Sequence, residues 1–111
     1  MENANGTNDL DIADDLVITR TTRRTWGGGT WVSGRLHGHR FDALVFPEHA
    51  KHPDWEIGQS CISKLWLCRL ADRETTYNWD RGLDVPPADE TTQAIIDFLC
   101  AGLADHVYGS R

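Results

Sequence analysis

Long hydrophobic runs are missing from this 111-residue chain. No stretch approaches the roughly 18 uninterrupted apolar residues that a membrane-spanning helix needs, so we expect no membrane contact. The segment from Met1 to Gly6 has neither a basic start nor an apolar run, which argues against a secretory signal. The 3 cysteines are an odd number, which argues against a closed disulfide framework. Together these absences predict a cytoplasmic protein with reduced thiols.

Motifs for nucleotide and metal chemistry are missing as well. Gly27-Gly28-Gly29 lacks the spaced glycines of a dinucleotide site and the lysine of a phosphate loop, so we interpret it as a turn. Zinc needs about four converging nitrogen or sulfur ligands, and no Cys-x-x-Cys pair is present. Cys61 and Cys68 lie in a strand-like segment whose alternation sends their side chains to opposite faces. The sequence therefore predicts no cofactor and no metal.

Two weaker groupings have a simpler interpretation. His49, His52 and Asp54 could form a surface metal cluster, but a solvated loop explains them equally. Asp80 and Asp84 could act as an acid–base pair, but an aspartate in a turn also accepts hydrogen bonds from backbone amides.

Nucleophilic catalysis would need a serine or cysteine beside an oriented base. The available side chains are Ser33, Ser60, Cys61 and Ser63. None of them lies in a nucleophile elbow, so we predict no catalytic residue. A hydrolase of unknown type stays as a second alternative.

Charge is unevenly distributed, although the net charge of the whole chain is -6. Residues 1–15 are polar and acidic, and we predict a disordered tail there. No acid occurs from Val17 to Phe41, a segment that holds the arginines Arg20, Arg23, Arg24, Arg35 and Arg40. Segregated charge of this kind indicates a partner rather than a fold.

Residues 16–111 are expected to form a single α+β domain. Alternating and β-branched segments predict an antiparallel meander of four or five strands. The expected strands are 19–26, 30–36, 39–46, 60–70 and 75–79. His37-Gly38 is typical of a hairpin turn, and Pro86-Pro87 should end strand pairing because proline has no amide donor.

One C-terminal amphipathic helix should pack on one face of this sheet. Asp89 can accept hydrogen bonds from its first amides, and Gly109 is placed where a helix commonly stops. Its apolar stripe at helical spacing consists of Ile95, Ile96, Leu99, Leu103 and Val107.

Three segments resemble a known family in their order and spacing. They are GHRFDALVF at 38–46, ISKLW at 62–66 and NWDRGLD at 78–84. They are similar to a small domain family of unknown function from bacteria and their phages or mobile elements, over roughly Trp31 to Ala104. The resemblance implies the sheet-plus-helix order and no reaction. An accessory role in a mobile element is implied by the resemblance alone.

Binding is the function that the residues favour. Lys64 and Trp66 are two positions apart and share one strand face, as do Trp31 and Arg35. The residues expected to contact a partner are Arg24, Trp31, Arg35, Arg40, Lys64 and Trp66. Because tryptophan and arginine dominate protein hot spots, we expect a non-enzymatic module that binds a protein partner or forms a homodimer. Single-stranded nucleic acid is the alternative, since basic grooves with stacking aromatics bind it.

Overall fold

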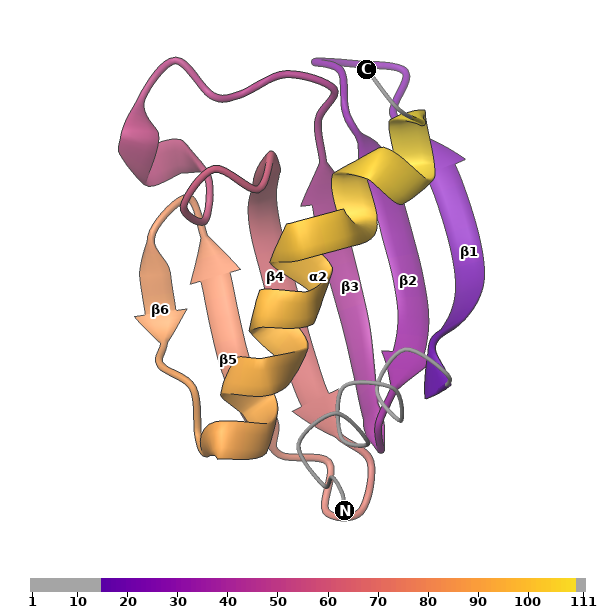
Figure 1. The fold of residues 1–111 in the computed structure, drawn as a ribbon, viewed down its shortest axis with the longest axis vertical. Helices are drawn as coiled ribbons and strands as arrows, with labels where there is room; N and C mark the ends of the chain where they lie inside the picture. Colours follow the sequence, from indigo (N-terminus) through magenta and orange to yellow (C-terminus); the bar gives the residue numbers. More distant parts are fainter. Residues whose placement is uncertain (1–14, 110–111) are drawn as a thin grey trace, which may run out of the picture.

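The computed structural model describes residues 15–109, so the expected acidic tail lies outside the described residues except for residue 15. Six strands form one antiparallel sheet in chain order (Figure 1). They are β1 (Val17–Arg23), β2 (Thr30–Leu36), β3 (His39–Val45), β4 (Ile62–Arg69), β5 (Thr75–Asp80) and β6 (Leu83–Val85). A 3-10 helix, η1 (Pro53–Trp55), interrupts the loop between β3 and β4, and α2 (Glu90–Tyr108) follows the sheet.

The predicted order of an antiparallel sheet and one C-terminal helix is confirmed, with six strands in place of four or five. The additional strand is β6, where Val85 pairs with Asn78 and Leu83 pairs with Trp79. Pro86 follows β6 directly, so the prolines end the sheet as expected, but a three-residue strand fits before them.

Both ends of α2 have the predicted caps. The Asp89 carboxylate accepts hydrogen bonds from the backbone N–H of Thr92 at 2.8 Å and from its hydroxyl at 2.7 Å. At the other end, Gly109 has a φ of 77° and donates its backbone N–H to Asp105. The Tyr108 hydroxyl then donates to the Val45 carbonyl at 2.9 Å and joins the end of the helix to the sheet.

The core lies between α2 and the sheet face that it crosses diagonally (Figure 1). Phe41 and Leu65 from the sheet and Ile95 and Leu99 from the helix are essentially inaccessible to solvent. Full burial of one such side chain contributes about 1.5–3 kcal/mol to folding. No helix within residues 15–109 is long and apolar enough to span a membrane.

Because side chains alternate along each strand, the sheet has a second face, which α2 does not cover; we call it the open face. The strand registers place on it Arg20, Thr22, Trp31, Ser33, Arg35, Arg40, Asp42, Leu44, Lys64, Trp66, Cys68, Asn78 and Asp80.

Candidate functional site

The open face brings together five of the six residues predicted to contact a partner. Trp31 and Arg35 lie on β2, Arg40 on β3, and Lys64 and Trp66 on β4. The expectation that Lys64 and Trp66 share a face is confirmed by their pairing with Asp80 and Asn78 on β5.

Trp66 is fixed at the centre of this face. It pairs with Asp42 on β3 and Asn78 on β5, and its indole N–H donates to the Thr75 hydroxyl at 3.1 Å. The Arg40 guanidinium lies over the ring, 5.8 Å from its centroid, in a cation–π arrangement. The half-buried tryptophan is thus already held in one orientation, which lowers the entropy cost of binding through it.

A shallow hollow of about 510 Å³ runs between the two tryptophans. Its lining includes Trp31, Trp66, Ser33, Asp42 and Lys64. The Ser33 hydroxyl donates to the Asp42 carboxylate, and Lys64 forms an ion pair with Asp80 at 3.5 Å. The hollow therefore combines aromatic walls with charges of both signs.

Arg24, the sixth predicted contact residue, lies apart from this group. Its side chain donates to the carbonyls of Gly28 at 2.6 Å and Gly27 at 3.3 Å, and its guanidinium lies over the Phe46 ring. The glycines of this turn are required: Gly29 has a φ of 87°, and a Cβ there would lie 3.1 Å from Leu44 and Phe46. Arg24 holds the turn closed, and a role for it in binding stays a prediction.

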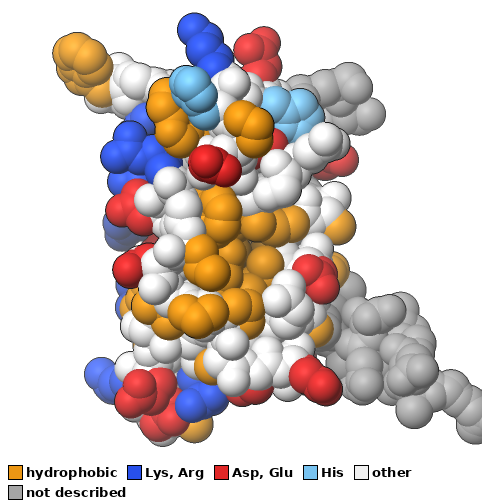
Figure 2. All heavy atoms as spheres, turned by 90° about the vertical axis from the view of Figure 1, so that its left-hand side faces the viewer, with side chains coloured by type: hydrophobic (Ala, Val, Ile, Leu, Met, Phe, Trp, Pro, Cys, Tyr) orange, Lys and Arg blue, Asp and Glu red, His pale blue; other side chains and the backbone are white. Residues whose placement is uncertain are grey.

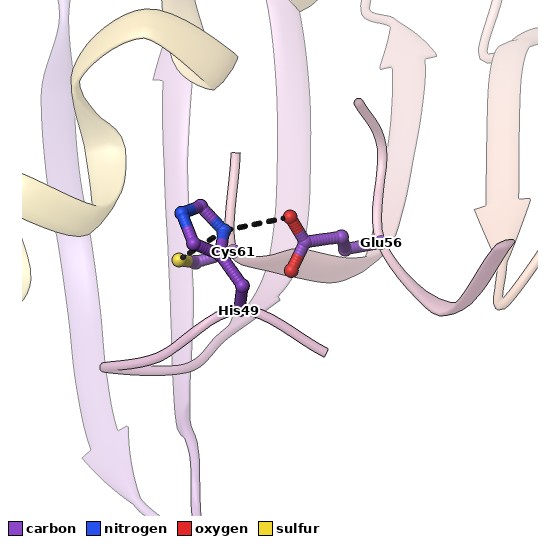
Figure 3. A group of neighbouring side chains, drawn as sticks. All are labelled: His49, Glu56 and Cys61. Atoms are coloured by element: carbon purple, nitrogen blue, oxygen red, sulfur yellow. Dashed lines mark hydrogen bonds and ion pairs between the residues drawn. The ribbon is translucent and has the colours of Figure 1, made fainter. Parts of the chain in front are cut away.

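A second group of side chains converges in the loop between β3 and β4 (Figure 3). His49 Nδ1 lies 2.9 Å from the Glu56 carboxylate and 3.5 Å from Cys61 Sγ. The other carboxylate oxygen of Glu56 accepts the backbone N–H of Ala50 at 2.6 Å. Glu56 and Cys61 are buried, whereas the His49 side chain is 61% exposed.

Sequence reasoning found His49 in this group but missed Glu56. The predicted companions lie elsewhere, since the His52 ring packs against Trp55 at 4.2 Å and Asp54 is exposed in η1. Glu56 has no sequence signal, because an isolated glutamate in a polar loop is usually solvated. Its role becomes visible through its burial in the folded chain.

This arrangement does not form a hydrolase triad. A triad uses one ring nitrogen toward the nucleophile and the other toward the orienting acid, whereas here Nδ1 makes both contacts. Among residues 15–109, no serine hydroxyl is hydrogen-bonded to a histidine. Burial raises the pKa of the Cys100 thiol to about 11, so this thiol is protonated at neutral pH.

Another hollow, of about 570 Å³, opens between α2 and the strands β5 and β6. Figure 2 shows hydrophobic side chains exposed in the middle of this side of the molecule. The hollow is lined mainly by apolar groups, including Trp79, Leu83, Pro87 and Ile96. The buried indole N–H of Trp79 has no hydrogen-bond partner in the described part of the chain.

The model of the family described as "Domain of unknown function (DUF7678)" matches residues 30–104. The chain belongs to this family. The match begins at the first residue of β2 and ends within α2, so it includes the loop cluster and the open face from β2 to β5. The predicted resemblance to a family of unknown function is confirmed. No match was found among curated proteins or among solved structures.

Proposed function

We propose that the domain is a protein-interaction module whose open face binds an acidic segment of a partner protein. The observation that carries the proposal is the presence of Trp31, Trp66 and two arginines, Arg35 and Arg40, on one surface that α2 leaves uncovered. Tryptophan and arginine are the side chains that most often anchor protein interfaces.

The charges on the face indicate the chemistry of the partner. Arg35 and Arg40 have no ion-pair partner among the described residues, so both are available to carboxylates. The hollow beside the tryptophans is suited to an apolar side chain that follows such an acidic group. A segment with carboxylates next to an apolar residue complements both features.

Asp42 and Asp80 favour protein over nucleic acid as the ligand. Asp42 pairs directly with Trp66, and Asp80 pairs with Lys64, so both carboxylates lie beside the hollow. A nucleic-acid strand carries a phosphate on every nucleotide and could not keep all of them away from these carboxylates, whereas a peptide can place its few carboxylates at Arg35 and Arg40 and an apolar side chain beside Asp42 and Asp80. Single-stranded nucleic acid is the alternative, favoured by the same two arginines and the stacking rings.

We further propose that this module works in the cytoplasm, because its 3 cysteines are an odd number, which argues against a closed disulfide framework. The accessory role in a mobile element implied by the sequence resemblance stays a prediction.

The experiment is a selection from a displayed library of acidic peptides, followed by fluorescence titration of the selected peptides and of single-stranded oligonucleotides. Trp66→Ala and Arg40→Ala should each weaken peptide binding by at least tenfold, as expected for anchors worth more than about 1.4 kcal/mol. The matched controls are Trp26→Ala, since Trp26 is 85% exposed in the glycine turn, and Arg23→Ala, since Arg23 does not belong to the open face.

An equal loss of peptide affinity in the control variants would overturn the assignment of the site. Saturable, salt-sensitive oligonucleotide binding that the same variants abolish would replace the protein partner with nucleic acid. Concentration-dependent sedimentation that Trp66→Ala abolishes would show that the partner is a second copy of this chain.

A further inference from the structure

The geometry points to a site for a zinc-class divalent cation at His49, Glu56 and Cys61, in the loop between β3 and β4. One potential ligand atom from each residue lies within 4.8 Å of the other two. The three residues come from different parts of the loop between β3 and β4, and their side chains point toward one another (Figure 3). The donors are an imidazole, a carboxylate and a thiol, which together favour zinc over magnesium or calcium.

The distance between the sulfur and nitrogen donors fits tetrahedral coordination. Zinc bonds of about 2.3 Å to sulfur and about 2.0–2.1 Å to nitrogen place the two ligand atoms about 3.5 Å apart at a tetrahedral angle. Cys61 Sγ and His49 Nδ1 lie 3.5 Å apart. The separation of 2.9 Å between Nδ1 and the Glu56 oxygen is that of a hydrogen bond, which must lengthen by a few tenths of an ångström around a metal.

The surroundings of Glu56 and Cys61 hold the ligands in position. One Glu56 oxygen accepts the Ala50 N–H at 2.6 Å, which leaves the other oxygen directed at His49. Cys61 has a φ of 66°, a left-handed conformation that is costly for a residue with a side chain. Its carbonyl accepts the Phe46 N–H at 2.9 Å, so this strained residue is fixed beside the end of β3.

The buried Glu56 carboxylate supplies a negative charge to the site. It is contacted by the Ala50 N–H and by His49 Nδ1, and a divalent cation would take the place of the contact with His49. Binding of a divalent cation releases the Cys61 thiol proton, and the thiolate, the carboxylate and the neutral imidazole then give a site of zero net charge.

The site has room for a fourth ligand. The three residues line a hollow of about 790 Å³, together with Arg24, Lys64 and Arg81. Three protein ligands and an open position are the arrangement that leaves zinc accessible to water or to an external ligand. These lining cations suit an anionic external ligand.

Calorimetric titration of Zn²⁺ into the reduced, untagged full chain tests this inference. We expect one ion per chain and a loss of affinity of at least about tenfold in His49→Ala, Glu56→Gln and Cys61→Ser. The controls Cys100→Ser and His52→Ala should bind Zn²⁺ as the unmodified chain does. Co²⁺ should add a thiolate-to-metal charge-transfer absorption that Cys61→Ser abolishes and Cys100→Ser retains.

Absence of Zn²⁺ binding, or binding that His49→Ala leaves unchanged, would overturn the site. The His49 side chain is largely exposed, so this variant keeps the core intact and decides the question even if Cys61→Ser does not fold. Far-ultraviolet circular dichroism of each variant confirms that a lost site is not a lost fold.

Discussion

Arg35 and Arg40 lie directly opposite each other in the pairing of β2 with β3, and both are exposed. Like charges in this position destabilise an antiparallel pair. Neither arginine has an ion-pair partner among residues 15–109. The sheet therefore carries an arrangement that costs stability and leaves two cations available to an external carboxylate, as the proposed binding role requires.

Replacement of one arginine should raise stability while it weakens binding. Arg35→Glu converts the like-charged pair into an opposite-charged pair, with an expected gain of about 0.2–1 kcal/mol in the free energy of unfolding. Urea denaturation measures this gain. Arg23→Glu is the control, because it changes the net charge equally while Arg23 faces Thr30. An equal gain in the control would show that net charge, and not the pair, is responsible.

Replacement of two glycines by alanine should change the stability of the domain in opposite directions. A Cβ at Gly34 would lie 2.4 Å from the Val17 carbonyl oxygen and 2.9 Å from the Phe41 ring. Gly34→Ala should therefore destabilise the domain by about 1–3 kcal/mol. A Cβ at Gly102 in α2 would meet no atom within 4 Å beyond the helix's own backbone, and Gly102→Ala should stabilise by about 0.5–1 kcal/mol. Thermal unfolding of both variants checks the signs, and a stable Gly34→Ala would contradict the close approach of β1 to β2.

Asp89 should make the stability sensitive to acid. Its hydrogen bonds from the Thr92 side chain and backbone lower its pKa below the ordinary 3.8. A lowered pKa means that the stabilisation is present above the unfolded-state value and is lost as the pH falls through the folded-state value. Asp89→Asn keeps a capping side chain but cannot titrate, so its unfolding temperature should fall less between neutral pH and pH values below 3.8. An equal fall in the unfolding temperatures of the two proteins with decreasing pH would contradict this role of Asp89.

Cys100 should make the stability sensitive to alkali. Burial raises the pKa of its thiol from 9.0 to about 11, with the neighbouring charge of Asp97 as a smaller cause. A raised pKa means that the stabilisation is complete below 9.0 and is lost as the pH rises toward about 11. The urea midpoint of Cys100→Ala should therefore decrease less than that of the unmodified chain between pH 9.0 and about 11. A residual fall is expected from Tyr77, whose pKa burial raises to about 12.

Local sequence patterns predicted most of the fold because strands, turns and helix caps depend largely on residues that are close together in the sequence. The strand Thr30–Leu36 has the predicted bounds, and the hairpin at His37-Gly38 follows from a glycine that adopts a positive φ. The helix was recognisable from its cap and its apolar stripe. The short strand β6 was missed because two prolines follow it, and the pattern did not reveal that three residues before them can still pair.

The candidate sites differ in how far the sequence predicted them. Period-two alternation is enough to place Lys64 and Trp66 on one face, and the strand registers then place Trp31 on the same face, two strands away. The loop cluster depends on the burial of Glu56 and on the left-handed backbone of Cys61. Neither property is a pattern of side-chain types, so this cluster could not be predicted before the fold was known.

The central claim is that the open face is the binding surface, and the five tryptophans of the chain allow a direct test. Indole N–H resonances of the ¹⁵N-labelled full chain would be followed by NMR while the tightest selected acidic peptide is added. The account predicts that the signals of Trp31 and Trp66 shift with saturation while those of Trp26 and Trp55 stay in place. Shifts confined to Trp26 and Trp55, with Trp31 and Trp66 unchanged, would contradict it.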